Sequence, residues 1–119
     1  FVASNESSAH QDFKQLVVDA NEGDTQLTLK ELAPVRLIKN AFYNKVQELY
    51  KTSPTVDELK ALLGRARAKK GMFEGDLENG ELEIGQISGL IHDIKPVAQI
   101  VQEIMTEFEE AQKQNLNYK

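Results

Sequence analysis

The sequence predicts a mainly α-helical chain, with about four helices and little strand. Apolar residues recur every three or four positions in four separate stretches, which is the spacing of amphipathic helices. Alternation of polar and apolar residues is confined to residues 25–29 and, more briefly, residues 82–84. The 119 residues suit one domain, and 40% apolar beside 28% charged residues lies in the globular range.

The first predicted helix follows an apolar segment, residues 1–3, that is typical of a strand end. Ser8 and Gln11 have the spacing of a capping box, which marks a helix start. The apolar stripe of this helix consists of Ala9, Phe13, Leu16, Val17 and Ala20. Residues 21–24 are typical of a turn and end the helix.

Two further helices are expected before residue 71. Pro34 suits the first turn of a helix, where a missing N–H costs nothing, and Arg36 and Asn40 would then share one helix face. The stripe of that helix is Val35, Ile38, Phe42, Val46 and Leu49. A capping box of Thr55 and Glu58 begins the next helix, at whose end lies a basic cluster of Arg65, Arg67, Lys69 and Lys70.

The last helix has the most regular pattern in the chain. We expect it over residues 96–114, opened by Pro96, with a stripe of Val97, Ile100, Val101, Ile104, Met105 and Phe108. Residues 115–119 are polar and are expected to form a disordered tail. Five of the seven glycines lie between residues 71 and 89, which indicates a turn-rich segment before this helix.

Composition excludes several classes of function. The absence of cysteine rules out disulfides, thiolate nucleophiles and cysteine-based metal sites, and the two histidines lie far apart in the sequence. A net charge of −5 argues against a nucleic-acid partner. No apolar run approaches the ~20 residues that span a bilayer, and no leader opens the chain, so we expect no membrane partner and a cytoplasmic location.

One segment has the composition of a binding loop, residues 85–89, with the sequence Gly-Gln-Ile-Ser-Gly. Its glycines allow a ligand to approach the backbone, and Gln86 offers both a donor and an acceptor; a tight turn is the competing interpretation. The acidic segment 74–83 lacks the spacing of an EF-hand. Because neither His10 nor His92 has an evident catalytic partner, we predict no catalytic and no metal-binding residue.

Four segments in one order carry a resemblance to a known family. They are residues 1–10 with Phe13 and Lys14, residues 24–25, residues 34–40, and residues 74–76 leading to 85–90. Together they resemble the C-terminal portion of the nitronate monooxygenase (2-nitropropane dioxygenase) family, which includes the flavin-dependent enoyl-acyl-carrier-protein reductase II. The resemblance extends to residues 94–96.

The resemblance implies an FMN-binding (β/α)8 TIM barrel with an inserted helical subdomain, of which this chain is the C-terminal part. Residues 1–23 would be the end of the last strand and its following helix, and 24–80 the inserted helical lid. Residues 81–95 would be a flavin-facing loop, in which Gly85, Gln86 and Ser88 bind the cofactor. Residues 96–114 would close the barrel wall.

The implied function is FMN-dependent oxidation of nitronates or reduction of enoyl thioesters with NAD(P)H. The implied partners are the N-terminal barrel portion, a small-molecule substrate and a homodimer as a candidate assembly. The chain has no initiator Met, and the family's catalytic histidine would lie upstream of Phe1, so this portion alone is expected to be inactive. Where enoyl reductases usually have methionine-alanine, this chain has Glu83 and Ile84, which leaves the reaction open.

Two alternatives from other classes remain. One is a free-standing helical interaction module whose amphipathic helices bury their stripes on one another. The other is an anion-binding regulatory subunit that uses Arg36 and the basic cluster at residues 65–70.

Overall fold

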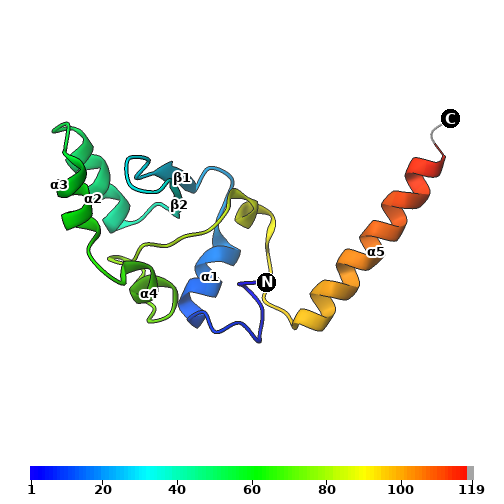
Figure 1. The fold of residues 1–119 in the computed structure, drawn as a ribbon. Coiled ribbons are helices and arrows are strands. Elements are labelled where there is room, and N and C mark those ends of the chain that lie inside the picture. Colours follow the sequence, from blue (N-terminus) through cyan, green and yellow to red (C-terminus); the bar gives the residue numbers. More distant parts are fainter. Residues whose placement is uncertain (118–119) are drawn as a thin grey trace.

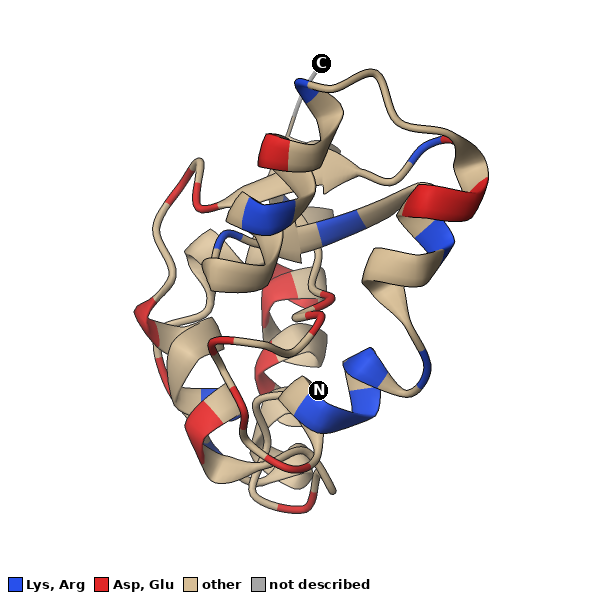
Figure 2. Ribbon diagram, turned by 90° about the vertical axis from the view of Figure 1, so that its left-hand side faces the viewer, with Lys and Arg blue, Asp and Glu red and all other residues tan. Residues whose placement is uncertain are grey.

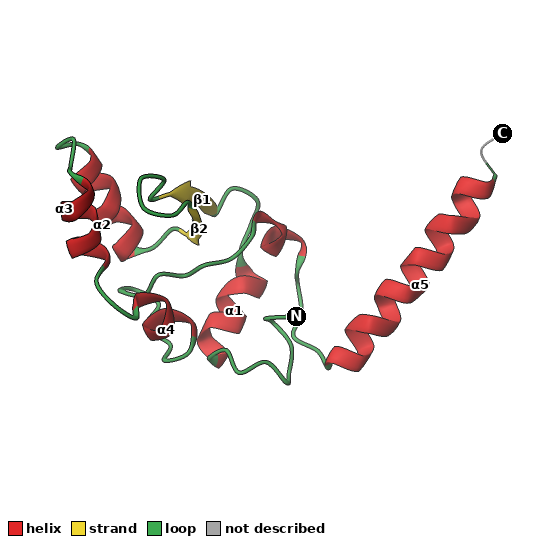
Figure 3. Cartoon of the chain, in the orientation of Figure 1, coloured by secondary structure: helices red, strands yellow, loops and turns green. Residues whose placement is uncertain are grey.

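The computed structural model describes residues 1–117 and is mainly helical (Figures 1 and 3). The four predicted helices are present, joined by a short additional helix, α4, one 3-10 helix, η1, and a two-stranded sheet. The elements in chain order are α1 (Gln11–Asp19), β1 (Thr25–Thr28), β2 (Val35–Ile38), α2 (Ala41–Tyr50), α3 (Val56–Leu63), α4 (Arg67–Met72), η1 (Gln86–Leu90) and α5 (Val97–Leu116).

The molecule has two parts of different character. Residues 1–95, which we call the body, hold every element except α5. Helix α5 projects away from the body, starting beside the N-terminus (Figure 1), and the extents of the molecule are 56 × 35 × 20 Å. Within the part of the chain that the structure describes, no helix is both long enough and apolar enough to cross a membrane.

The hairpin of β1 and β2 replaces the first turns of a predicted helix. The two strands pair antiparallel, with Thr25 opposite Ile38 and Thr28 opposite Val35. The helix expected from Pro34 therefore begins only at Ala41. The β-branched residues that suggested a helical stripe also suit a strand, and β1 supplies the pairing edge that an isolated segment lacks. Arg36 lies on β2, so the prediction that it shares a helix face with Asn40 was wrong.

The helix caps agree with the sequence in one case and differ in another. At α3 the predicted capping box is confirmed: the Glu58 N–H donates to Thr55 Oγ1 at 3.2 Å, and the Thr55 N–H donates to Glu58 Oε2 at 2.7 Å. At α1 the predicted box of Ser8 and Gln11 was wrong. His10 caps this helix instead, because its Nδ1 accepts from the Asp12 N–H at 3.1 Å.

Arg67 joins three segments of the body. Helix α3 ends at Leu63, earlier than expected, and Arg67 begins α4. Its guanidinium donates to the carbonyl oxygens of Leu63 (2.6 Å) and Leu62 (3.0 Å), at the end of α3, and of Asn79 (2.8 Å). It also lies 4.5 Å from the ring centroid of Phe42, a cation–π contact. This cation therefore satisfies carbonyls that the end of a helix leaves without partners.

Two hydrophobic clusters form the core of the body. The first contains Ala3, Ala9, Phe13, Val17, Ile38 and Leu82, and the second contains Leu29, Leu37, Phe42, Val46 and Leu59. Leu37 and Ile38 are neighbours on β2, and successive strand residues point to opposite faces, so this strand separates and links the two clusters. Burial of each large side chain contributes ~1.5–3 kcal/mol.

Helix α5 is attached to the body near its first two turns, where Glu103 is hydrogen-bonded to Lys95. The Asn5 N–H donates to the Lys95 carbonyl at 3.1 Å, and the Val97 N–H donates to Glu6 Oε2 at 2.9 Å. No residue of α5 is buried. The helix extends through Leu116, so the expectation of a disordered tail from residue 115 was wrong for its first two residues; residues 118–119 of that tail lie outside the described chain.

Candidate functional site

The predicted binding loop lies between the hairpin, α1 and the start of α5. Its beginning is attached to β2, because the Ile84 N–H donates to the Arg36 carbonyl at 3.2 Å. The chain then turns into η1, where the Ser88 N–H donates to the Gly85 carbonyl at 3.1 Å. Gly89 packs on the turn after α1: a methyl group there would lie 3.2 Å from the Glu22 nitrogen. Tertiary contacts thus fix both ends of η1.

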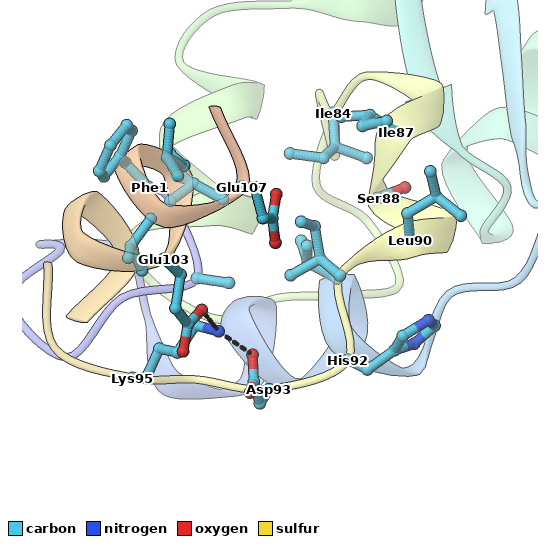
Figure 4. Close-up of a pocket in the computed structure, with 16 residues that line it drawn as sticks. Phe1, Ile84, Ile87, Ser88, Leu90, His92, Asp93, Lys95, Glu103 and Glu107 are labelled. Atoms are coloured by element: carbon cyan, nitrogen blue, oxygen red, sulfur yellow. Dashed lines mark hydrogen bonds and ion pairs between the residues drawn. The ribbon is translucent and has the colours of Figure 1, made fainter. Parts of the chain in front are cut away.

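A cavity of about 440 Å³, the Ser88 pocket, lies between η1, the N-terminus and α5 (Figure 4). Ser88 is 1% exposed, and its Oγ has no hydrogen-bond partner among the described residues. A buried hydroxyl without a partner costs ~1–3 kcal/mol, so such groups in native proteins call for a missing partner. Most of the wall is apolar, including Phe1, Val2, Ala3, Val17, Ile84, Ile87, Leu90, Ile91, Ile100 and Ile104.

Charged side chains form the edge of the Ser88 pocket beside α5. Lys95 Nζ lies 3.4 Å from Asp93 Oδ1 and is hydrogen-bonded to Glu103 Oε2 (Figure 4). The bond to Glu103 is the main reason that the pKa of Lys95 is raised, and the same bond lowers the pKa of Glu103. Both groups are therefore charged near neutral pH, and they connect the body to α5.

A second cavity, of about 690 Å³, lies on the other side of η1 and is called here the Arg36 pocket. Its lining consists of Glu22, Gly23, Thr25, Arg36, Gln86, Ile87, Gly89 and Leu90. Gln86 and Ser88 therefore line different cavities, although both belong to η1. Gly85 lies just before them, and a methyl group on it would meet no other atom within 4 Å.

Glu81 is a buried acid that the sequence interpretation missed. Burial is the main cause that raises its pKa to about 7, and repulsion by the Glu83 carboxylate adds to the shift, whereas Arg67 opposes it. The sequence pattern that could have predicted it is the alternation Glu81-Leu82-Glu83. In an extended segment this alternation puts both acids on one side, while Leu82 enters the core. Glu81 lines neither pocket, so it affects stability rather than a ligand.

Other polar residues singled out from the sequence have structural contacts. His10 caps α1 and packs on Gly75, where a methyl group would lie 2.6 Å from the imidazole. Asp76 accepts from the Asn79 N–H at 2.9 Å, the largest cause of its lowered pKa, and pairs with Lys70 at 3.3 Å. His92 lines the Ser88 pocket. Among residues 1–117, no three His, Cys, Asp or Glu side chains are grouped as a metal site.

The overall fold of the chain is similar to that of solved structures. FabK from Thermotoga maritima matches with a TM-score of 0.84 and 35% sequence identity over 99% of this chain and 37% of the FabK chain. The M276A mutant of the same protein matches with a TM-score of 0.81 and 35% identity, over 99% of this chain and 35% of that one. No curated protein sequence matched at a significant level.

The chain thus spans about a third of the length of the FabK chains that it matches. It has the fold of a part of a TIM-barrel enzyme, mainly helical in itself. The family model described as nitronate monooxygenase, an oxidoreductase family, matches residues 1–107. Because that match covers most of the sequence, this chain belongs to the nitronate monooxygenase family.

Proposed function

We propose that this chain is the C-terminal part of an FMN-dependent oxidoreductase and that η1 contacts the flavin. Membership of the nitronate monooxygenase family supports the class of reaction. The observation that carries the proposal is the unpartnered, buried hydroxyl of Ser88 beside a cavity whose wall is mostly apolar. A flavin ring offers carbonyl and nitrogen atoms at its edge, with which a hydroxyl can form hydrogen bonds.

The residues at the start of η1 suit a flat, partly polar group. Space is open beside Gly85, because a methyl group there would have no neighbour within 4 Å. Ser88 supplies a hydroxyl beside the Ser88 pocket, whereas Gln86, on the same short helix, lines the Arg36 pocket. Bound FMN would carry the electrons of the reaction. The chain's own part is to orient the cofactor through these residues and to exclude water with the apolar wall of the Ser88 pocket.

Two reactions fit the proposal: oxidation of an anionic alkyl nitronate, and NAD(P)H-dependent reduction of an enoyl thioester. The catalytic base would come from the longer protein, as would most of the barrel, since this chain spans about a third of a FabK chain. Assays of the full-length protein with an alkyl nitronate, and with a trans-2-enoyl thioester plus NADPH or NADH, distinguish the two. Turnover of neither substrate contradicts both assignments.

Flavin binding by the full-length protein tests the role of η1 directly. Gly85→Ala meets no clash in this chain, so lower flavin affinity in that variant points to contact with the cofactor. Ser88→Ala removes a hydroxyl that has no partner in the described chain, so it should not weaken folding and should lower flavin affinity about tenfold. Ser8→Ala, at an exposed serine, is the matched control. Unchanged flavin affinity in both the Gly85→Ala and the Ser88→Ala variants contradicts the proposal.

The 119-residue chain alone should retain no yellow flavin and show no NAD(P)H-driven turnover. The full-length protein should retain the flavin and show that turnover. Visible absorbance after gel filtration measures the bound flavin. Stoichiometric FMN on the isolated chain would contradict the proposal that most of the binding site lies elsewhere. A compact monomer that unfolds cooperatively, with α5 protected, would instead favour the free-standing helical module.

A further inference from the structure

The Arg36 pocket contains a fixed cation that the flavin proposal does not use. Arg36 Nη1 donates to the Thr25 carbonyl at 3.3 Å and to Thr25 Oγ1 at 3.2 Å, which holds the guanidinium in one orientation. A guanidinium has five N–H donors, so several remain for another partner. No carboxylate of residues 1–117 lies within 4 Å of it. The charge of Arg36 is therefore not neutralised by an ion pair in the described chain.

Further groups around the cavity define what would fit there. Gln86 lines it and makes no hydrogen bond through its amide within the described chain. Lys39 adds a second positive charge at the edge, because its Nζ donates to the carbonyl of the lining residue Gly23 at 3.1 Å. The single acid of the lining is Glu22. Cations and an amide beside one acid favour an anionic group over a cation.

Two apolar residues of the lining are open to solvent. Ile87 is 62% exposed and Leu90 is 71% exposed, which leaves an apolar surface within the same cavity as Arg36. Burying such a surface stabilises a complex by ~25 cal/mol per Å². A ligand that has an apolar part attached to an anionic end would use both regions of the pocket at once.

We propose that the Arg36 pocket binds the carboxylate or phosphate end of a small organic molecule, whose apolar part lies on Ile87 and Leu90. Arg36 would form two parallel hydrogen bonds with the anion, and Gln86 would add a third. The proposal uses Arg36 without the basic cluster at residues 65–70. In that cluster Arg67 is bonded to three carbonyl oxygens, and Lys69 and Lys70 pair with Glu74 and Asp76.

The test titrates the full-length protein with hexanoate and with its neutral analogue hexanamide, followed by calorimetry or by NMR shifts of the Gln86 amide. Hexanoate should bind about tenfold or more tightly than hexanamide, because a hydrogen bond to a charged partner contributes ~1.5–3 kcal/mol. Arg36→Gln should abolish that preference. Arg65→Gln, at an exposed arginine between α3 and α4, should leave it unchanged.

Two variants keep the test valid if Arg36→Gln disturbs the hairpin. Leu90→Asp leaves the bonds between Arg36 and Thr25 in place and adds a negative charge to the pocket, so it should weaken hexanoate binding. Glu22→Gln removes the opposing charge and should strengthen that binding about two- to threefold. Equal affinity for hexanoate and hexanamide in the wild type, or no change in either variant, overturns the proposal.

Competition identifies the source of the anion. If NADPH displaces hexanoate and NADH does not, the pocket binds a nucleotide phosphate; if hexyl phosphate or hexanoate binds and neither nucleotide competes, it binds a free organic anion. Both results support an anion pocket. Because binding is measured without turnover, loss of hexanoate binding with flavin retained overturns this inference alone, and loss of flavin with hexanoate binding retained overturns the proposed function alone.

Discussion

The body and helix α5 arise from the same kind of sequence pattern but differ in what covers their apolar faces. In the body, the stripes of α1, α2 and α3 are buried in two hydrophobic clusters. In α5, which projects from the body (Figure 1), no residue is buried, and most of the stripe is exposed: Val101, Ile104, Met105 and Phe108. Periodicity therefore predicts a helix and its apolar face, whereas the surface that covers this face can belong to another segment.

The match to FabK gives this contrast a physical reason. It covers 99% of this chain, so α5 is part of the shared fold, yet only 35–37% of the FabK chain is matched. Exposed apolar patches on this scale mark interaction surfaces. We therefore expect further polypeptide of the longer protein to cover the α5 stripe, Val101, Ile104, Met105 and Phe108.

Truncation of one phenylalanine in each part gives the largest expected effect. Phe42 is 1% exposed in the second cluster, so Phe42→Ala should destabilise the 119-residue chain by about 3–5 kcal/mol. Phe108 is 58% exposed on α5, so Phe108→Ala should change that stability by less than about 0.5 kcal/mol. Urea unfolding of the two variants measures the difference.

The same Phe108→Ala variant in the full-length protein tests whether the α5 stripe is covered there. If the stripe is covered in that protein, Phe108→Ala should lower the free energy of unfolding by about 2–4 kcal/mol. An equally small effect in both contexts would mean that α5 stays exposed in the longer protein. A large effect in the 119-residue chain would mean that the α5 stripe is already buried there, for instance against a second copy of the same chain.

The fold could be predicted where local chemistry decides it. The box of Thr55 and Glu58 fixes the start of α3 by itself, and the stripe of α5 fixes a long helix. The prediction of a helix over residues 34–40 was wrong because Val35 and Ile38 have helical spacing but are β-branched residues that also suit a strand, and the pairing with β1 decides between the two. The cap at His10 was missed because imidazole is an uncommon cap, and Ser8 had the more familiar pattern.

Arg67 is the next largest test, because it holds the end of α3 to the rest of the body. Arg67→Gln removes three hydrogen bonds to carbonyl oxygens and the contact with the Phe42 ring. We expect a loss of about 2–3 kcal/mol in the free energy of unfolding. Arg65→Gln should lie within about 0.5 kcal/mol of the wild type, since Arg65 is exposed. An equal loss of stability in Arg67→Gln and Arg65→Gln would mean that net charge, rather than the Arg67 hydrogen bonds, determines the effect.

The buried acid of the body gives a pH-dependent prediction. The folded pKa of Glu81, about 7, lies above its ordinary value of 4.5, so the fold binds the proton more tightly than the unfolded chain does. The stabilising effect of the neutral form is complete below about pH 4.5 and is lost as the pH rises through about 7. Glu81→Gln should therefore stabilise the chain near pH 8 by about 1–2 kcal/mol and change little near pH 4.

Urea unfolding across that pH range measures the effect, and Glu78→Gln is the control at an exposed acid. Glu83→Gln should have a smaller effect in the same direction, because repulsion by Glu83 is the second cause of the shift. A stability difference between Glu81→Gln and wild type that does not vary with pH would rule out a titrating Glu81 as its source.

The candidate site could be predicted as a segment but not as a geometry. The glycines and polar residues of 85–89 indicated a loop able to contact a ligand, and this loop borders both pockets. That Ser88 is buried without a partner, and that Gln86 lines a cavity with Arg36 instead, depends on how η1 packs on α1 and how residue 84 bonds to β2. These contacts join residues far apart in the sequence, so no local pattern predicts them.

The smallest expected effect concerns the joint between the two parts. Glu6 Oε2 accepts from the Val97 N–H, one of the first-turn donors of α5 that has no partner within the helix (2.9 Å). Glu6→Ala should raise the hydrogen-exchange rate of the Val97 amide by about fivefold, as expected for loss of a cap. The amides of α1 should be unaffected, because its cap is His10. If exchange in α1 rises as much as in α5, Glu6 supports the body as a whole, and the two parts are less separate than the exposed stripe implies. If exchange rises only in the first turn of α5, the bond at Glu6 serves to position this helix, whose apolar face is left for another segment to cover.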